Sequence, residues 1–235
     1  MNTPYPLVTI LCGGLGTRLG NLTADFQKCM LPVGNKPFLE HTLKQLSDQN
    51  FKKILLLTGY KSDSIRKYFG DGKWLDLEID YVEDQHNQGT AYALCQAKEY
   101  IDERFLLLYG DIYRMINYTS LIKEKPNLLG VYQYSEGLTT VDFPNIQLNS
   151  DCSEVLSYSK RNINRLCDYV DAGFGYFYKQ CIDHIEPVGS FESQAYIYLS
   201  KEGTLKPYIV DDIFWDIGNL DDLQRAQEKA KLDII

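Results

Sequence analysis

Residues 7–20 read LVTILCGGLGTRLG, an apolar run that breaks into a loop rich in glycine. Glycines at 13, 14 and 16 remove side chains from the backbone that follows the run, so that successive N–H groups can point at anionic oxygens. Thr17 adds a hydroxyl donor, and the guanidinium of Arg18 can bind two phosphate oxygens at once. The stretch therefore predicts a buried strand that ends in a triphosphate-binding loop.

The glycine spacing separates this loop from two common phosphate-binding loops. Residues 13–20 follow the pattern G-G-x-G-x-x-x-G, whereas dinucleotide folds use G-x-G-x-x-G and P-loops use G-x-x-x-x-G-K-[ST]. No acidic residue ends a second strand about 20 residues further on, where a dinucleotide ribose would be bound. Taken alone, the loop leaves one alternative, a glycine-rich turn with a surface arginine.

Apolar runs of strand length alternate with helical periodicity in the first half of the chain. The runs are residues 7–11, 53–59, 77–83 and 105–111. Helices are predicted between them at 35–46, 62–70 and 89–101. The second of these helices is expected to begin on a capping Ser62 and to end at Gly70. This alternation is typical of a mostly parallel sheet that is covered on both faces.

The pattern changes after residue 111. Strands of more antiparallel character are predicted at 128–134, 154–160 and 169–178, followed by a helix, a strand and a final amphipathic helix at 219–232. We find no internal repeat and no linker. The prediction is one α/β domain over 1–235, a three-layer, Rossmann-like αβα fold whose mixed, mostly parallel sheet carries an inserted antiparallel portion.

Charge and composition exclude several partners. Lys and Arg number 24 and Asp and Glu number 32, which gives a formal charge of −8. Such a charge disfavours nucleic acid and anionic membranes. The six cysteines are scattered without a C-x-x-C pair, and no segment approaches the about 20 apolar residues of a membrane span. We expect reduced thiols, a cytoplasmic location and no membrane partner.

Two aspartates follow apolar segments that are far apart in the sequence. Asp111 ends the run at 105–111, and Asp216 follows the apolar residues 213–215. Each alone is as compatible with a strand-to-loop turn as with function. Carboxylates at the ends of two buried strands, in a chain with an anion-binding loop, nevertheless favour a Mg²⁺ site. Lys28 is a single cation in an apolar stretch that is expected to return toward the same edge of the sheet.

Residues 13–41 resemble the signature of the sugar-1-phosphate nucleotidyltransferases, which make nucleoside-diphosphate sugars. Five further segments are similar to that family in the expected order: YVEDQHNQGTAYAL, FLLLYGDI, VLSYSK, YVDAGFGYF and IFWDIGNLDDLQRA. The resemblance spans nearly the whole chain. It implies a glycosyltransferase A-like fold with a nucleotide-binding half at 1–111 and a sugar-phosphate-binding half at 112–235.

The resemblance also implies a role for each matched position. Arg18 and Lys28 are the implied catalytic cations. The implied nucleotide-binding residues are Leu11, Gly13, Gly14, Gly16, Thr17, Arg18, Glu83, Gly89 and Thr90. The implied sugar-phosphate-binding residues are Lys160, Asp171 and Gly173, and the implied Mg²⁺ ligands are Asp111 and Asp216.

The chain departs from the family pattern at four positions. Gln27 stands where the family has the proline of Pro-Lys, and Ser159 replaces the glutamate of Glu-Lys. Asp171 replaces an asparagine, which turns a donor and acceptor into an acceptor only. Tyr92 replaces a small residue beside the base site. These changes affect specificity rather than the phosphate and metal apparatus.

Within the family, the short chain looks most like the compact guanylyltransferases that act on heptose or mannose 1-phosphate. We therefore expect GTP and D-glycero-alpha-D-manno-heptose 1-phosphate as substrates, with thymidylyl, uridylyl or cytidylyl transfer to a hexose 1-phosphate as alternatives. A catalytically silent nucleotide-sugar-binding protein is the alternative from another class. A homo-oligomer is compatible with these features.

Overall fold

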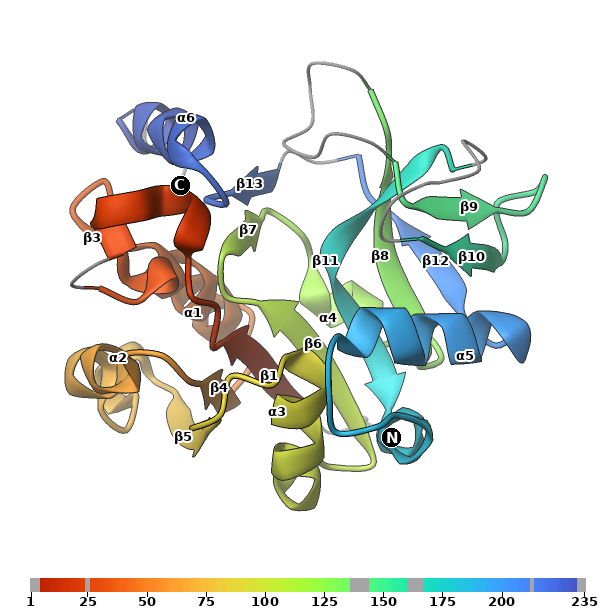
Figure 1. Ribbon diagram of the computed structural model, residues 1–235, viewed down its shortest axis with the longest axis horizontal. Helices are drawn as coiled ribbons and strands as arrows, with labels where there is room; N and C mark the ends of the chain where they lie inside the picture. The colour runs from red at the N-terminus through yellow and green to blue at the C-terminus, as the bar shows by residue number, and fades with distance from the viewer. Residues whose placement is uncertain (1–4, 24–25, 136–143, 160–166, 212–213, 232–235) are drawn as a thin grey trace.

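The computed structural model describes residues 5–23, 26–135, 144–159, 167–211 and 214–231. Within these ranges nine strands form one mixed sheet (Figure 1). Its parallel part has the order β6-β1-β4-β5, formed by Arg104–Tyr109, Leu7–Cys12, Lys53–Thr58 and Glu78–Glu83. These are the four strands that the apolar runs predict.

Strand β11 (Tyr169–Tyr178) joins the parallel part to the second half of the chain. It pairs antiparallel with β8 along one edge, and with β9 and then β6 along the other. The remaining strands of the sheet are β8 (Leu128–Gln133), β9 (Ile146–Leu148), β10 (Val155–Tyr158) and β12 (Lys206–Ile209). The predicted fold class, including its antiparallel portion, is confirmed.

Helices cover both faces of the sheet because its strands are apolar on both sides. In β1, Val8 and Ile10 pack in one core and Leu7 and Leu11 in another. The first core includes α1 (Phe38–Asp48), α2 (Ser62–Phe69) and α4 (Tyr118–Leu121); the second includes α3 (Thr90–Ala97), α5 (Ile197–Lys201) and the π-helix η6 (Glu192–Tyr196). Each large apolar side chain that is fully buried in this way contributes about 1.5–3 kcal/mol.

The expected cap at Ser62 is wrong. Lys61, in a left-handed conformation, occupies the position before α2, and the Ser62 hydroxyl donates instead to Glu83 at 2.6 Å. The predicted end of the helix is confirmed, because Gly70 caps it with a positive φ of 56°. The Ser62 hydroxyl thus bonds to the end of β5 instead of capping α2.

A third, smaller core lies beside the sheet and was not predicted. Short strands β7 (Ile112–Arg114) and β13 (Phe214–Asp216) pair antiparallel and place Asp216 opposite Ile112. Trp215 of this pair stacks on Tyr113, with ring centroids 5.7 Å apart. The C-terminal helix α6 (Leu220–Ala230) packs on the pair and on the hairpin of β2 (Pro32–Val33) and β3 (Lys36–Pro37), so that the first and last parts of the chain lie side by side (Figure 1).

Short 3₁₀ helices connect these elements: η1 (Thr17–Thr23), η2 (Lys28–Met30), η3 (Lys73–Leu75), η4 (Lys98–Tyr100) and η5 (Lys179–His184). No helix in the described ranges is both long enough and apolar enough to cross a membrane.

Candidate active site

A cavity of about 290 Å³ opens at the carboxyl ends of the parallel strands. Open α/β sheets place their ligands at this edge. The predicted residues that line it are Leu11, Gly13, Gly14, Lys28, Gly89, Thr90 and Asp111. Gly16, Thr17, Arg18 and Glu83 are not among its lining residues. The structure therefore brings the loop, Lys28 and Asp111 together around one space.

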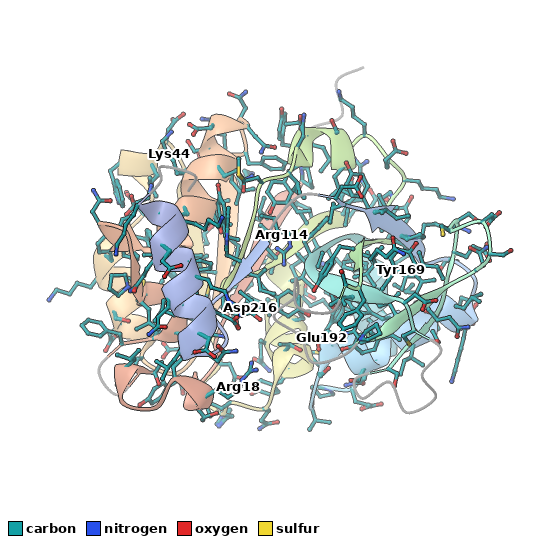
Figure 2. The ribbon with its side chains drawn as sticks, turned by 90° about the horizontal axis from the view of Figure 1, so that it is seen from above. Arg18, Lys44, Arg114, Tyr169, Glu192 and Asp216 are labelled. Carbon is teal, nitrogen blue, oxygen red and sulfur yellow. The ribbon has the colours of Figure 1, made fainter. Side chains whose placement is uncertain are left out.

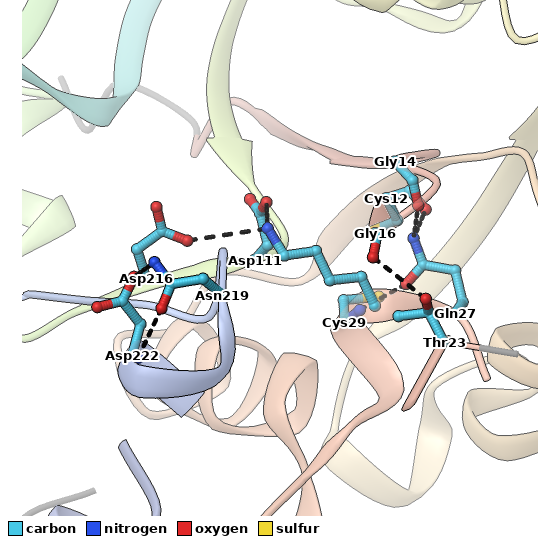
Figure 3. A network of polar contacts seen from close by, with 11 residues as sticks. Cys12, Gly14, Gly16, Thr23, Gln27, Cys29, Asp111, Asp216, Asn219 and Asp222 are labelled. Atoms are coloured by element: carbon cyan, nitrogen blue, oxygen red, sulfur yellow. Dashed lines mark hydrogen bonds and ion pairs between the residues drawn. The ribbon is translucent and has the colours of Figure 1, made fainter. Parts of the chain in front are cut away.

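Lys28 and the two predicted metal aspartates form one ion cluster (Figure 3). The Nζ atom of Lys28 lies 2.5 Å from Oδ2 of Asp111 and 3.8 Å from Oδ1 of Asp216. The three residues come from η2, the end of β6 and β13. The lysine side chain is only 7% exposed, which agrees with its prediction as a single cation in an apolar stretch.

Burial and charge act against each other on the pKa values of this cluster. Burial lowers the pKa of Lys28, but the carboxylates of Asp111 and Asp216 outweigh it, so that the net shift is upward. Burial raises the pKa of Asp111, but the charge and hydrogen bond of Lys28 outweigh it, and the net shift is downward. Burial and the charge of Asp111 raise the pKa of Asp216 to about 6. Asp216 is thus the poorly compensated carboxylate.

One carboxylate oxygen of Asp216 is paired with Lys28 only at 3.8 Å and, within the described residues, lacks a hydrogen bond. This oxygen is the buried Oδ1 atom. An unsatisfied acceptor close to a second carboxylate fits a hard divalent cation, which prefers oxygen ligands. No group of three or more His, Cys, Asp or Glu side chains suited to a metal occurs in the described ranges. A Mg²⁺ ion bound here would need further oxygen ligands from substrate phosphates or water.

The side chain of Gln27, a residue that is only 2% exposed, fixes the backbone of the loop after β1. Its Nε2 donates to the carbonyls of Cys12 and Gly14, and its Oε1 accepts from the N–H of Cys29 (Figure 3). Gly16 has a φ of +65°, and a Cβ there would lie 2.6 Å from Cγ2 of Thr23. Gly16 thus allows the loop to fold back onto Thr23, whose hydroxyl donates to the Gly16 carbonyl.

Arg18 and Thr17 are exposed on η1. A Cβ at Gly218 would lie 3.2 Å from Nη2 of Arg18 and 3.0 Å from Oδ1 of Asp216. Gly218 therefore leaves room for the guanidinium to approach the aspartate, near helix α6 (Figure 2). The structure brings Arg18 to the side of Asp216 rather than to the wall of the cavity.

Three predicted nucleotide-binding residues also hold parts of the chain together. Glu83 ends β5 and accepts the hydrogen bond of Ser62. Gly89 has a φ of +103°, and a Cβ there would meet the carbonyl oxygen of Gly189 at 2.1 Å. The hydroxyl of Thr90 accepts from the N–H of Phe191 at 2.8 Å. Gly89 and Thr90 thus join the start of α3 to the second half of the chain.

Glu192 is a buried acid at this junction that the sequence analysis missed. Its carboxylate accepts hydrogen bonds from the hydroxyls of Tyr109, Thr90 and Ser190. Tyr109 and Thr90 line the cavity. The only signal in the sequence is a single acidic residue in the otherwise uncharged stretch at 190–200. The structure adds that Glu192 begins a π-helical turn, a feature often found at functional sites.

The predicted sugar side contains a second missed residue, Arg114. Its side chain is buried over the ring of Phe174, and within the described residues its Nε and Nη2 atoms have no hydrogen-bond partner. A Cβ at Gly173 would lie 2.4 Å from Nη2 of Arg114. Only glycine, here with a φ of +66°, leaves this space. Arg114 ends β7, approaches β11 at Gly173 and Phe174, and is not among the residues that line the cavity.

Asp171 lies two residues before Gly173, whose N–H donates to its carboxylate at 2.6 Å. Burial raises the pKa of Asp171 to about 7, although the Gly173 N–H opposes this shift. Lys160 lies outside the described residues. Of the other departures, Ser159 donates its N–H to the carbonyl of Asn145, and the ring of Tyr92 stands edge-on to His86.

Comparison with known proteins identifies the class of the molecule. Residues 7–232 match the model of the nucleotidyl transferase family. The chain therefore belongs to this family, as its motifs predict.

Several relatives cover almost the whole chain. The chain is similar to D-glycero-alpha-D-manno-heptose 1-phosphate guanylyltransferase from Campylobacter jejuni, with 27% identity over 89% of this chain and 93% of that protein. It is also similar to mannose-1-phosphate guanylyltransferase from Mycobacterium tuberculosis, with 29% identity over 92% of this chain and 62% of that protein. The crystal structure of HddC from Yersinia pseudotuberculosis complexed with GMP-PN superposes with a TM-score of 0.78, at 25% identity over 96% of this chain and all of that one.

Proposed function

We propose that the chain condenses GTP with D-glycero-alpha-D-manno-heptose 1-phosphate and releases pyrophosphate. An oxygen of the sugar phosphate forms a bond to the α-phosphorus of GTP, while the bond to the β-phosphate oxygen breaks. The observation that carries this proposal is the ammonium of Lys28 held between Asp111 and Asp216 at the wall of the loop cavity. With Mg²⁺ held at the two carboxylates, such a site would bind phosphates and orient them.

The reaction needs little proton transfer, because the attacking sugar phosphate is already anionic. Its difficulty is to bring two polyanions together in line. In this proposal, the loop from Gly13 to Thr17 and Arg18 hold the triphosphate, and Lys28 neutralises charge that develops on the α-phosphate. Lys160, Asp171 and Gly173 contact the sugar phosphate. Positioning and electrostatic stabilisation then supply most of the acceleration.

Asp111 and Asp216 would hold Mg²⁺, which supplies positive charge against the phosphate oxygens when it is bound. The Oδ1 atom of Asp216, which accepts no hydrogen bond within the described residues, supports this assignment. The protein as a whole carries a charge of −8, so the few cations of the site have to offset a repulsive background.

The sugar and the base are inferred from the relatives. Two of these, the Campylobacter jejuni and Mycobacterium tuberculosis proteins, are guanylyltransferases by name. A Bacillus subtilis relative of 28% identity is a probable glucose-1-phosphate cytidylyltransferase. The heptose enzyme is favoured because its length matches this chain almost completely.

The test is pyrophosphate release with Mg²⁺ over a grid of GTP, dTTP, UTP and CTP against heptose, mannose and glucose 1-phosphates. We expect the highest kcat/KM for GTP with D-glycero-alpha-D-manno-heptose 1-phosphate. A higher value for another pair would reassign the sugar or the base. No release with any pair, while nucleotide binding persists, would favour a binding protein without catalysis.

A further inference from the structure

Gln27 is a buried side chain whose amide makes three hydrogen bonds near the cavity. Its amide has two N–H donors, which meet the carbonyls of Cys12 and Gly14, and its Oε1 accepts from Cys29 at 2.6 Å. Only one orientation of the amide satisfies this set, because the carbonyls need donors and the Cys29 N–H needs an acceptor. A proline at this position could make none of these bonds.

The bonds to the two carbonyls fix the direction of two N–H groups. In a planar trans peptide unit, the carbonyl and the N–H of the next residue point in opposite directions. The units that join Cys12 to Gly13 and Gly14 to Leu15 are trans. When Gln27 draws both carbonyls to its own side, the N–H groups of Gly13 and Leu15 turn to the opposite side.

Those two N–H groups are available for a ligand. Gly13 and Leu15 both line the cavity. In the described part of the chain, neither N–H has a backbone acceptor. Two N–H groups that face the same way form a concave site for an anion. The third bond of Gln27 reaches the residue after Lys28, so the same side chain fixes the loop relative to the lysine.

We propose that Gln27 is a positioning residue that orients the N–H groups of Gly13 and Leu15 toward the triphosphate and sets the loop against Lys28. This inference rests on the proposed role of the loop in triphosphate binding. The glycines alone leave the backbone of this loop conformationally free, and the side chain of Gln27 fixes it in one conformation.

The test compares Gln27→Met with Gln49→Met. Both changes remove a glutamine amide that donates to a backbone carbonyl. Gln49 follows directly after α1, donates to the carbonyl of Ile116 at 2.8 Å, and does not line the cavity. Binding of GTP and of inorganic tripolyphosphate is measured by titration calorimetry, beside thermal melts. We expect Gln27→Met to weaken both ligands by about 10- to 100-fold, as when one or two charge-assisted hydrogen bonds are lost. Gln49→Met should bind both ligands as the wild type does.

Steady-state kinetics separates positioning from a general loss of structure. In Gln27→Met the KM for the nucleotide should rise while the KM for the sugar phosphate stays unchanged. Gln27→Glu keeps the acceptor for Cys29 but faces both carbonyls with a carboxylate, so it should bind tripolyphosphate still more weakly. Equal binding by the wild type and Gln27→Met would overturn the inference while leaving the proposed function intact.

A measurement on the wild type avoids any failure of the variants to fold. Tripolyphosphate should slow hydrogen exchange at the amides of Gly13 and Leu15. Binding without protection of these two amides would contradict the proposed orientation. If the wild type binds neither GTP nor tripolyphosphate, the proposed function fails, and this inference fails with it.

Discussion

The environment of the Asp171 carboxyl group affects the stability of the whole protein. Burial raises its pKa from the ordinary 3.8 to about 7. Between these two pH values the folded state holds a proton that the unfolded state has lost. The free energy of unfolding therefore falls as the pH rises through this window. An asparagine at this position cannot titrate.

Asp171→Asn should accordingly remove part of the pH dependence of stability. On going from pH 5 to pH 8, the melting temperature of the wild type should fall by roughly 5–10 °C more than that of the variant, because about two pH units of this window at about 1.4 kcal/mol each correspond to about 2–3 kcal/mol in a domain of this size. Thermal melts at both pH values measure the difference. Equal pH slopes would show that the carboxyl is ionised at pH 5 in the folded protein.

Single residues also mark the limit of sequence reasoning. Lys28 stood out as a lone cation, and its contact with Asp111 agrees with that prediction. The two hydrogen bonds that Gln27 donates have no such signal, because they depend on the position of a loop 13–15 residues away. Glu192 meets Tyr109 across 83 residues. Contacts of this kind follow from tertiary folding and leave no local periodicity.

At the scale of elements, the pair of β7 and β13 holds Asp216 in the site. Trp215 is buried and stacks on Tyr113 within the third core. The four parallel strands were predictable from apolar runs of about six residues. Strands β7 and β13 have only three residues each, which is too short for a recognisable alternation of apolar and polar residues. Asp216 was therefore predicted to follow an apolar segment, but the pairing of β13 with β7 was not predicted.

Trp215→Ala should loosen this element and the site together. We expect a loss of about 3–5 kcal/mol in the free energy of unfolding, as for other large-to-small changes in a core. The chain's other tryptophan is a matched control, because Trp74 is 56% exposed. Trp74→Ala should cost about 1 kcal/mol or less. Urea unfolding measures both variants, and equal losses would contradict the role assigned to the third core.

At the scale of the whole molecule, one sheet runs through both halves of the chain. Strand β11 of the second half pairs along β6 of the first, and Gly89 packs against Gly189 across the same boundary. Separate unfolding of the halves would expose the edge of β6 and both adjoining cores. We therefore expect one cooperative transition, in agreement with the prediction of a single domain over 1–235.

Variants that keep one tryptophan each can test this expectation. Trp215→Phe leaves Trp74 to report on the first half, and Trp74→Phe leaves Trp215 to report on the third core. After correction for the stability of each variant, fluorescence and circular dichroism should give coincident urea transitions. Two separate midpoints within one variant would indicate that the halves unfold independently.

The central claim is that Asp111, Asp216 and Lys28 form a catalytic site. Asp216→Asn tests it most directly, because this change removes an incompletely compensated charge and leaves the shape of the side chain unchanged. Relief of repulsion from Asp111 should keep the stability equal to that of the wild type or raise it. Asp222→Asn is the matched control, since Asp222 is buried nearby but bonded to Asn219 at the start of α6.

The deciding measurement is the rate of pyrophosphate release by these two variants, with the best substrate pair from the grid. The account predicts that kcat/KM falls by at least about 100-fold in Asp216→Asn, without a loss of stability, and stays near the wild-type value in Asp222→Asn. Near-normal release by Asp216→Asn would contradict the assignment of this site.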